Sequence, residues 1–197
     1  MAGKEIEKLT KLIAKLPSLG TRSSRRIVLQ LLKKRESLFL PLIEALQEVA
    51  ANVKTCEICG NYDTVSPCSI CASEKREDAT LCVVQDVADL WAMERVSFFK
   101  GKYHVLNGLI SPLDDVNPED IGIDKLLDHL NKNDYKEIIL AFKPNVEGEI
   151  TSLYIKKILE NTGIKITRLA SGVPIGADME YIDSLTLSKA LEDRKEI

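Results

Sequence analysis

The sequence predicts a mixed α/β protein that begins with an all-helical part. Apolar residues recur at helical spacing through residues 1–53, four cysteines gather in residues 54–77, and short apolar runs alternate with helical stretches in residues 78–170. Strands that alternate with helices imply a mostly parallel sheet with right-handed crossovers. We therefore expect a helical module, a cysteine-rich module, an α/β domain and, over residues 171–197, an extended C-terminal arm.

The first 35 residues are expected to form two amphipathic helices joined by a turn at residues 17–20. Their apolar stripes are Ile6, Leu9, Ile13 and Leu16, then Ile27, Val28, Leu31 and Leu32. The pattern continues beyond Pro41, which a helix tolerates only in its first turn. A helical unit of this size has a marginal core, so we expect it to lean on its neighbours or on another subunit.

Four strands and three helices are expected in the α/β domain. The strands are predicted over residues 81–84, 103–106, 137–142 and 165–169, and the helices over residues 87–94, 124–131 and 149–160. Cys82 is expected in the core. Trp91 and the pair Phe98 and Phe99 could lie in the core or at an interface, and the core is favoured. The tail from Ser171 contains two glycines and a proline within six residues, which is typical of an extended arm rather than another layer.

The composition excludes several classes of protein. Of the 197 residues, 45% are hydrophobic and 29% are charged, as in soluble globular proteins. The longest wholly apolar stretch covers residues 38–43, far fewer than the roughly 18 residues of a membrane span. The N-terminal segment lacks the pattern of a secretion signal. We expect a cytoplasmic protein that does not contact the membrane.

Charge is distributed unevenly along the chain. The net charge is -3, whereas residues 1–35 alone carry ten basic and two acidic side chains. A basic end on an acidic body favours an anionic partner, of which nucleic acid is the commonest. Solvated helix faces without any partner would give the same distribution, so charge alone leaves both interpretations open.

Two Cys-x-x-Cys pairs, Cys56 with Cys59 and Cys68 with Cys71, are separated by eight residues. Four thiolates arranged as a tetrahedron select zinc. A reducing location disfavours disulfides, and a redox Cys-x-x-Cys would not need a second copy. Because protein ligands would fill every coordination position, we predict one structural Zn²⁺ per chain that contributes folding free energy rather than catalysis.

Three arginines open the helix that follows the turn at residues 17–20. Arg22 and Arg26 are four residues apart and therefore share a helix face, with Arg25 beside them. Free backbone N–H groups at a helix start favour phosphate oxygens. We expect this segment to bind DNA through its phosphates, without reading the base sequence.

The same segment resembles a helix-hairpin-helix motif, a DNA-binding element whose turn usually contains two glycines. Gly20 matches the second glycine, and Ser18 replaces the first. The replacement is expected to make close approach of the backbone to DNA slightly harder.

Segments that follow two predicted strands resemble a Toprim domain, which occurs in topoisomerases, primases and some nucleases. In that domain a glutamate after the first strand and an Asp-x-Asp pair after a later one hold magnesium. These positions are Gln85, Lys143 and Asn145 here. Because magnesium needs oxygen ligands, we do not expect magnesium-dependent cleavage or joining of nucleic acid. Glu147 and Glu149 keep an acidic character, either as a vestigial metal site, as a partner contact or as acids that complement a helix dipole.

The order of these parts resembles the RecR family of bacterial recombination mediators. The resemblance extends over residues 107–114, the Gly-Val-Pro segment at residues 172–174, and residues 183–187. It implies a non-enzymatic DNA-repair protein that forms ring-like oligomers, commonly tetramers, and works with RecO and RecF partners to load recombinase onto gapped DNA. It also implies that Arg22 and Arg26 bind DNA, that the four cysteines hold zinc, and that Glu147 and Glu149 contact a partner.

Two other functions stay open at this point. A magnesium-dependent Toprim nuclease or primase-like enzyme would have to recruit other acids, such as Glu147, Glu149, Asp86 and Asp89. Asp86 and Asp89 more simply begin the following helix. A zinc-stabilised adaptor without a nucleic-acid role would not be retained on DNA at low salt.

Overall fold

The computed structural model describes residues 3–194. The chain divides into two compact units, one that ends at Val53 and one that begins at Lys54. The division falls where the sequence changes from helical periodicity to the cysteine-rich segment.

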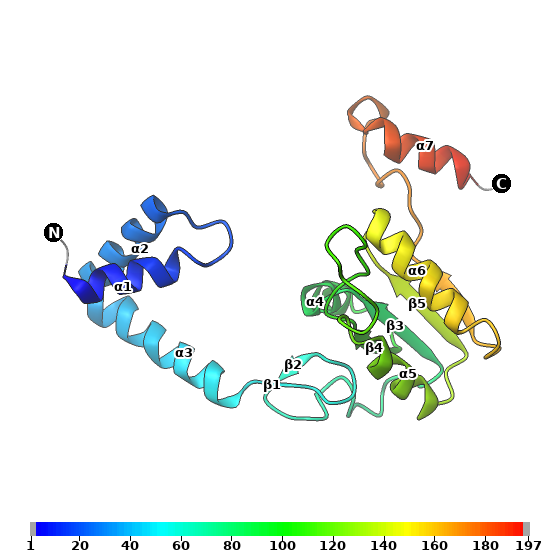
Figure 1. Ribbon diagram of the computed structural model, residues 1–197, viewed down its shortest axis with the longest axis horizontal. Coiled ribbons are helices and arrows are strands. Elements are labelled where there is room, and N and C mark those ends of the chain that lie inside the picture. The colour runs from blue at the N-terminus through cyan, green and yellow to red at the C-terminus, as the bar shows by residue number, and fades with distance from the viewer. Residues whose placement is uncertain (1–2, 195–197) are drawn as a thin grey trace. The chain divides into compact units, whose positions relative to one another are not determined.

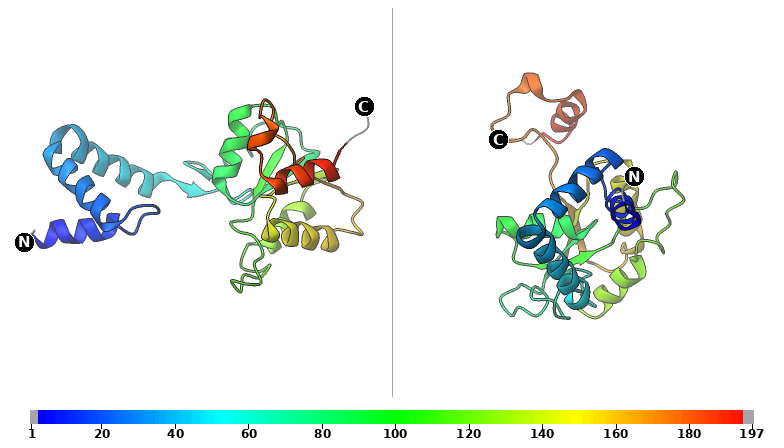
Figure 2. Two further views of the ribbon diagram at one scale, coloured as in Figure 1. Left: turned by 90° about the horizontal axis from the view of Figure 1, so that it is seen from above. Right: turned by 90° about the vertical axis from the view of Figure 1, so that its left-hand side faces the viewer.

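The first unit is helical, as predicted. It contains α1 (Lys4–Ile13), α2 (Thr21–Lys33), the π-helical turn η1 (Arg35–Phe39) and α3 (Leu40–Asn52), with a proline in the first turn of α3. Helices α1 and α2 pack side by side (Figures 1 and 2). Val28 and Leu31 are buried, but no residue of α3 is. The core of this unit is therefore small, and the apolar side chains of α3 are not buried.

The second unit contains a short antiparallel hairpin followed by an α/β domain. Its elements are β1 (Lys54–Thr55), β2 (Tyr62–Asp63), β3 (Thr80–Val84), α4 (Val87–Val96), β4 (Lys102–Val105), α5 (Ile123–Asn131), β5 (Glu137–Ala141), α6 (Val146–Ile158), β6 (Lys165–Arg168), η2 (Met179–Tyr181) and α7 (Ser184–Glu192). The four strands β3 to β6 form a parallel sheet in the order β4-β3-β5-β6. All four predicted strands and three predicted helices are present, although α6 begins three residues earlier than expected.

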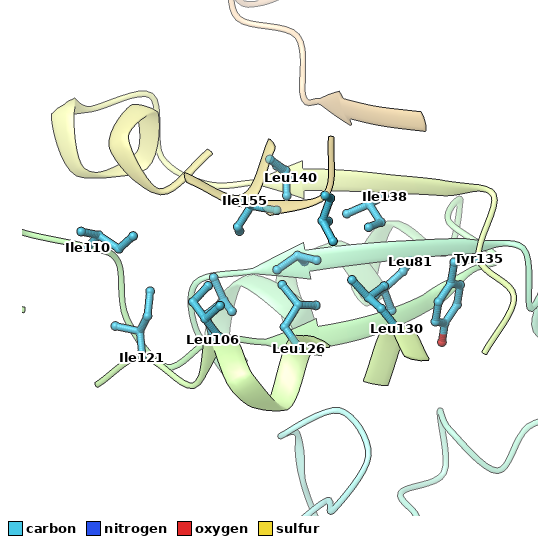
Figure 3. Packing of buried hydrophobic residues seen from close by; sticks show 13 residues of the cluster. Leu81, Leu106, Ile110, Ile121, Leu126, Leu130, Tyr135, Ile138, Leu140 and Ile155 are labelled. Carbon is cyan, nitrogen blue, oxygen red and sulfur yellow. The ribbon is translucent and has the colours of Figure 1, made fainter. Parts of the chain in front are cut away.

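Both faces of this sheet are buried, which explains why its strands have continuous apolar runs rather than alternating ones. On one face, Leu81 and Ile138 pack with Leu126 of α5 and Ile155 of α6 (Figure 3). On the other face, Cys82 packs near Leu90 of α4. Cys82 is fully buried and lies apart from the four-cysteine cluster, as predicted.

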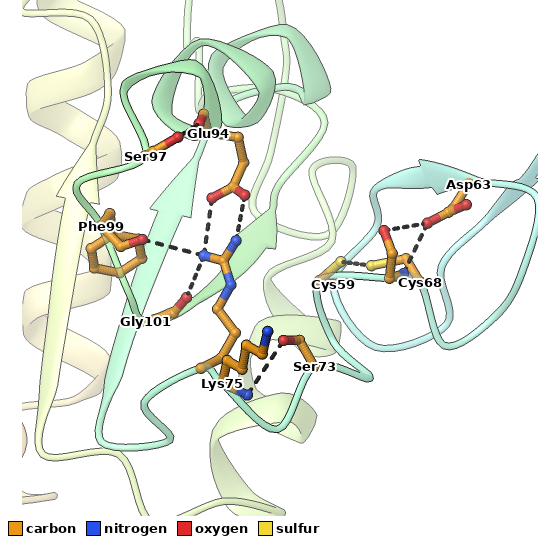
Figure 4. A network of polar contacts seen from close by, with 11 residues as sticks. Cys59, Asp63, Cys68, Ser73, Lys75, Glu94, Ser97, Phe99 and Gly101 are labelled. Atoms are coloured by element: carbon orange, nitrogen blue, oxygen red, sulfur yellow. Dashed lines mark hydrogen bonds and ion pairs between the residues drawn. The ribbon is translucent and has the colours of Figure 1, made fainter.

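The segment between the cysteines and the sheet is held by one arginine. The Arg76 guanidinium donates to both carboxylate oxygens of Glu94, to the Phe99 carbonyl at 3.3 Å and to the Gly101 carbonyl at 3.2 Å (Figure 4). Arg76 also lies over the ring of Tyr103, 5.9 Å from its centroid. Loss of either partner would leave a partly buried charge unpaired, which destabilises the fold. Because Arg76 also binds two carbonyls of the loop after α4, it holds this loop in place.

The aromatic residues expected in the core divide into two groups. Phe99 packs edge to face on Tyr103, with ring centroids 5.1 Å apart. Trp91 is 53% exposed and Phe98 is 87% exposed, so the expectation of burial is wrong for these two side chains. The sequence does not show which of Phe98 and Phe99 is buried, because neighbouring residues in an irregular segment do not alternate regularly between two sides.

The C-terminal arm leaves the sheet after β6, as the ribbon shows (Figure 1). Residues 169–178 have no regular structure, in line with the expected extended arm. Helix α7 follows, capped by the Asp183 carboxylate, which accepts from the Thr186 N–H. This helix was not among the predicted elements, although the pair of Asp183 and Thr186 is a helix-start signal.

Two buried histidines face each other, one on β4 and one on α5. His104 Nδ1 lies 3.1 Å from His129 Nδ1, and the Tyr135 hydroxyl lies 3.0 Å from His129 Nε2. Burial lowers the pKa of His104 to about 3 and, with the charges of Lys102 and Lys132, lowers the pKa of His129 to about 4. Both rings are therefore neutral in the folded protein at neutral pH.

These histidines should make the protein less stable in mild acid. Below a pH of about 6.5 these histidines become protonated in the unfolded chain but stay neutral in the folded chain. The free energy of unfolding therefore falls as pH falls, by up to about 1.4 kcal/mol per pH unit for each histidine. Urea unfolding measured between pH 7 and pH 5 checks this slope. The variant His129→Gln, which cannot take up the proton, is expected to have a shallower slope, and an unaltered one would contradict the assignment.

Candidate zinc and nucleic-acid sites

The four cysteines of the two Cys-x-x-Cys pairs come together. Their sulfur atoms all lie within 4.8 Å of one another, and all four residues are buried. The Sγ atoms of Cys59 and Cys68 are 3.6 Å apart, and those of Cys56 and Cys71 are 3.9 Å apart. Ligands about 2.3 Å from a tetrahedral zinc ion are separated by about 3.8 Å, so the cluster fits this metal. None of these cysteines forms a disulfide.

The surroundings of the sulfurs also suit thiolates. The N–H of Asn61 donates to Cys59 Sγ at 3.4 Å, and the N–H of Cys68 donates to Cys56 Sγ at 3.3 Å. The neighbouring Cys71 thiol lowers the pKa of Cys59 to about 6, and the same interaction raises the pKa of Cys71. Without a cation, one thiolate thus raises the pKa of the neighbouring thiol. A divalent ion removes this conflict, and when bound it would supply structural cross-linking.

The zinc finger is anchored to the edge of the sheet. The Val105 N–H donates to the Cys59 carbonyl at 2.8 Å, and Lys102 Nζ donates to the Cys71 carbonyl at 3.2 Å. Gly60 has φ +81°, and a Cβ there would lie 3.2 Å from the Val105 side chain. Gly60 therefore permits both the tight turn and the close approach to β4. The finger thus contacts the edge strand β4 at both of its ends.

The three arginines lie at the start of α2, as predicted, and all are exposed. No side chain caps this helix start, so its first backbone N–H groups are free to bind an anion. Within residues 3–194, none of the three guanidinium groups forms an ion pair. Arg26 lines a groove with Ser23, whereas Arg25 lines a groove on the side of α1. Arg25 and Arg26 therefore border different grooves of the helical unit.

The replaced glycine of the hairpin has a visible structural consequence. Ser18 has φ +62°, in the left-handed region that glycine adopts freely. The side chain is exposed, so nothing in its surroundings compensates for the strain.

We expect Ser18→Gly to stabilise the helical unit by about 1 kcal/mol, because glycine has no Cβ penalty at positive φ. Thermal unfolding followed by circular dichroism checks this increase. Ser37→Gly is a matched control, since it places glycine inside a helical segment and should destabilise the unit. A Ser18→Gly protein that unfolds at a lower temperature than the parent would contradict the assignment of strain.

Gln85, Lys143 and Asn145, the three positions that resemble those of Toprim metal ligands, follow strands at the carboxyl end of the sheet. Gln85 follows β3, and its Oε1 is buried without a hydrogen-bond partner in the described part of the chain. The Asn145 side chain caps α6 by accepting from the Gly148 N–H at 2.9 Å. A Cβ at Gly148 would collide with the Lys143 carbonyl, so only glycine fits this turn. Asn145 thus caps the start of α6, and an asparagine just before a predicted helix is a sequence signal of this role.

Glu147 and Glu149 lie in the first turn of α6 and differ in their environment. Both carboxylate oxygens of Glu149 accept from Arg168 Nη1, at 2.6 and 2.9 Å. Glu147 forms no ion pair with any residue from 3 to 194. Both acids suit the positive end of the helix dipole. Over the same residues, no group of three or more acidic, histidine or cysteine side chains converges apart from the four cysteines.

Among residues 3–194, no helix has both the length and the apolar character needed to span a bilayer.

Family models match three consecutive segments of the chain. A model of the RecR zinc finger domain with four cysteines matches residues 53–73, a "Toprim domain" model matches residues 79–170, and a "RecR, C-terminal" model matches residues 172–195.

Curated relatives match along the full length. The Recombination protein RecR of Rhodospirillum rubrum is 49% identical over 197 residues, which cover 100% of both chains. That of Bradyrhizobium sp. (strain ORS 278) is 48% identical over 194 residues, 98% of each chain. That of Sinorhizobium medicae is 49% identical over 197 residues, 100% of this chain and 98% of the relative.

Proposed function

Because this chain belongs to the RecR family of recombination proteins, we propose that it is a non-enzymatic mediator of DNA repair that binds gapped DNA and helps to load a recombinase. It acts as a ring-like oligomer, with tetramer as the expected size, together with RecO- and RecF-type partners. Residues 1–53 contact DNA, residues 54–77 hold zinc, residues 78–170 contact partner proteins, and residues 171–197 serve as an arm in assembly.

The exposed arginines at the start of α2 carry the DNA-binding part of this proposal. Arg22 and Arg26 share a face, have no ion pair within residues 3–194 and flank free backbone N–H groups. Such a set of donors fits the oxygens of a phosphate backbone and reads no bases.

Exposed apolar surface supports the oligomer. On α3, Leu46 is 61% exposed and Val49 is 59% exposed, and on the arm Ile175 and Leu185 are mostly exposed. Apolar surface of this extent marks a protein interface. Several basic hairpins in one ring would also bind one DNA together, so that weak single contacts add through effective concentration.

The arrangement at the carboxyl end of the sheet favours a partner contact over catalysis. Arg168 neutralises Glu149, Asn145 caps a helix, and an ammonium group stands at position 143. Two scattered acids and one cation make a poor magnesium site. Glu147 remains available for a basic group of a partner protein.

The test is a DNA-binding titration on gapped duplex at several salt concentrations, with molar mass from light scattering and magnesium-dependent turnover assayed in parallel. We expect a salt-dependent complex formed by an oligomer, without turnover. Turnover that stays with the protein through purification and disappears in the double variant Glu147→Gln and Glu149→Gln would instead support a Toprim enzyme. A monomer that binds no DNA at low salt would support the adaptor.

A further inference from the structure

Large apolar side chains are exposed in α4 and in the segment that follows it. Trp91 is 53% exposed, Val96 is 72% exposed and Phe98 is 87% exposed. The neighbouring Phe99 is used in the core against Tyr103, whereas Phe98 stands in solvent. Large aromatic side chains exposed within one short segment indicate an interaction surface rather than a structural role.

The zinc finger fixes the orientation of the indole ring. Trp91 Nε1 donates to Asn61 Oδ1 at 3.0 Å. Asn61 is buried, its carbonyl accepts from the Cys56 N–H at 2.7 Å, and its own N–H donates to Cys59 Sγ. The ring is thus held through a residue that lies between zinc ligands. A ring oriented in advance loses little conformational entropy when a ligand stacks on it.

Two basic side chains, Arg95 and Lys100, lie near these aromatic residues along the chain, and the acidic residue Glu77 lies beside Lys100, where its backbone N–H donates to the Lys100 carbonyl at 2.9 Å. Arg95 follows Trp91 by four residues and therefore lies on the same helix face. Arg95 and Lys100 are exposed, and neither forms an ion pair within residues 3–194. The acid next to Arg95, Glu94, is paired with Arg76 (Figure 4). The other acids of α4 lie in and before its first turn, at the opposite end of the helix.

Aromatic rings beside free cations match the chemistry of single-stranded nucleic acid. Unpaired bases offer flat π faces to the rings, and the phosphates that join them pair with basic side chains. A duplex cannot use the rings, because its bases are already stacked on one another. An aliphatic partner surface would need only apolar contacts and would not need Arg95 and Lys100.

We propose that Trp91 and Phe98 form a stacking platform for unpaired bases of single-stranded DNA, with Arg95 and Lys100 on its phosphates. This inference rests on the proposed function and deepens it, because it assigns a separate surface to the single-stranded part of a gapped substrate. The hairpin arginines bind the phosphates of the duplex part of that substrate.

The only tryptophan of the chain lies in the platform, so its fluorescence reports binding directly. We expect an oligothymidylate of about 20 nucleotides to quench the emission of the full-length protein, and a blunt duplex of equal length to leave it nearly unchanged. Phe98→Ala should weaken single-strand affinity by about 5- to 100-fold, which corresponds to the loss of one stacked base. Duplex affinity should stay the same.

Two further variants separate base stacking from apolar docking. Phe98→Tyr keeps an aromatic face and should bind oligothymidylate like the parent. Phe98→Leu keeps apolar area without a π face and should bind as weakly as Phe98→Ala. Parental affinity in Phe98→Leu, or no quenching by oligothymidylate while duplex still binds, would overturn the platform and leave a protein partner as the occupant. Absence of binding to any DNA, duplex included, would refute the proposed function itself.

Discussion

Replacing Cys68 by serine should abolish zinc binding and unfold the zinc finger. Cys68 is fully buried in the cluster, 3.6 Å from Cys59 Sγ. Structural zinc contributes about 10 kcal/mol or more to the folding of small modules, and serine is not a replacement for thiolate. We expect zinc content to fall from about one ion per chain to less than a tenth, together with a lower melting temperature. Metal analysis and calorimetry of the purified protein measure both.

Cys82→Ala is the matched control for this experiment. Cys82 is also fully buried, but it belongs to the sheet rather than the cluster. The variant should keep its zinc and lose only about 1 kcal/mol through a small cavity. A Cys68→Ser protein that retains stoichiometric zinc and parental stability would show that the cluster is not the metal site.

The second large effect concerns the hairpin. The triple variant Arg22→Ala, Arg25→Ala, Arg26→Ala should bind duplex DNA about 100-fold more weakly, since each exposed arginine on a phosphate contributes about 1 kcal/mol. The dependence of log affinity on log salt should also become shallower by about 0.9 for each phosphate that the protein no longer neutralises. Fluorescence anisotropy over a range of salt concentrations measures both quantities. The fold should not change, because all three side chains are exposed.

A charge-matched variant distinguishes a local contact from overall charge. Lys132→Ala, Lys156→Ala, Lys157→Ala removes the same number of exposed positive charges from the end of α5 and from α6. It should retain most of the affinity and most of the salt dependence. Equal weakening in the two variants would mean that binding follows net charge and that the hairpin has no special part in it.

Much of the architecture could be predicted because the signals are local and periodic. The four strands of the sheet are continuous apolar runs, since both of its faces are buried. The zinc cluster follows from spacing, because two Cys-x-x-Cys turns can present their sulfurs to a common centre. Helix α7 was missed because its apolar residues have no core to face: Leu185 and Leu191 are mostly exposed.

Residue roles were harder to predict where one residue type serves two purposes. An asparagine at position 145 was interpreted as a replaced metal ligand, and the structure shows a helix cap. An alternation of sides between Phe98 and Phe99 cannot be derived from an irregular segment, so which ring is buried depends on where Tyr103 lies. The arginines of α2 were placed on the correct helix, but only packing against α1 separates Arg25 from Arg26.

By itself, the sequence determined the zinc ligands, the helical and α/β parts, and the family resemblance, because each depends on residue types at fixed spacing along the chain. The tertiary structure alone decided that the zinc finger holds Trp91 through Asn61, a contact between residues thirty positions apart. It also decided that Arg168 neutralises Glu149 across the sheet domain. Such pairings depend on how strands and helices pack together. Because the two partners are far apart in the sequence, no local pattern predicts them.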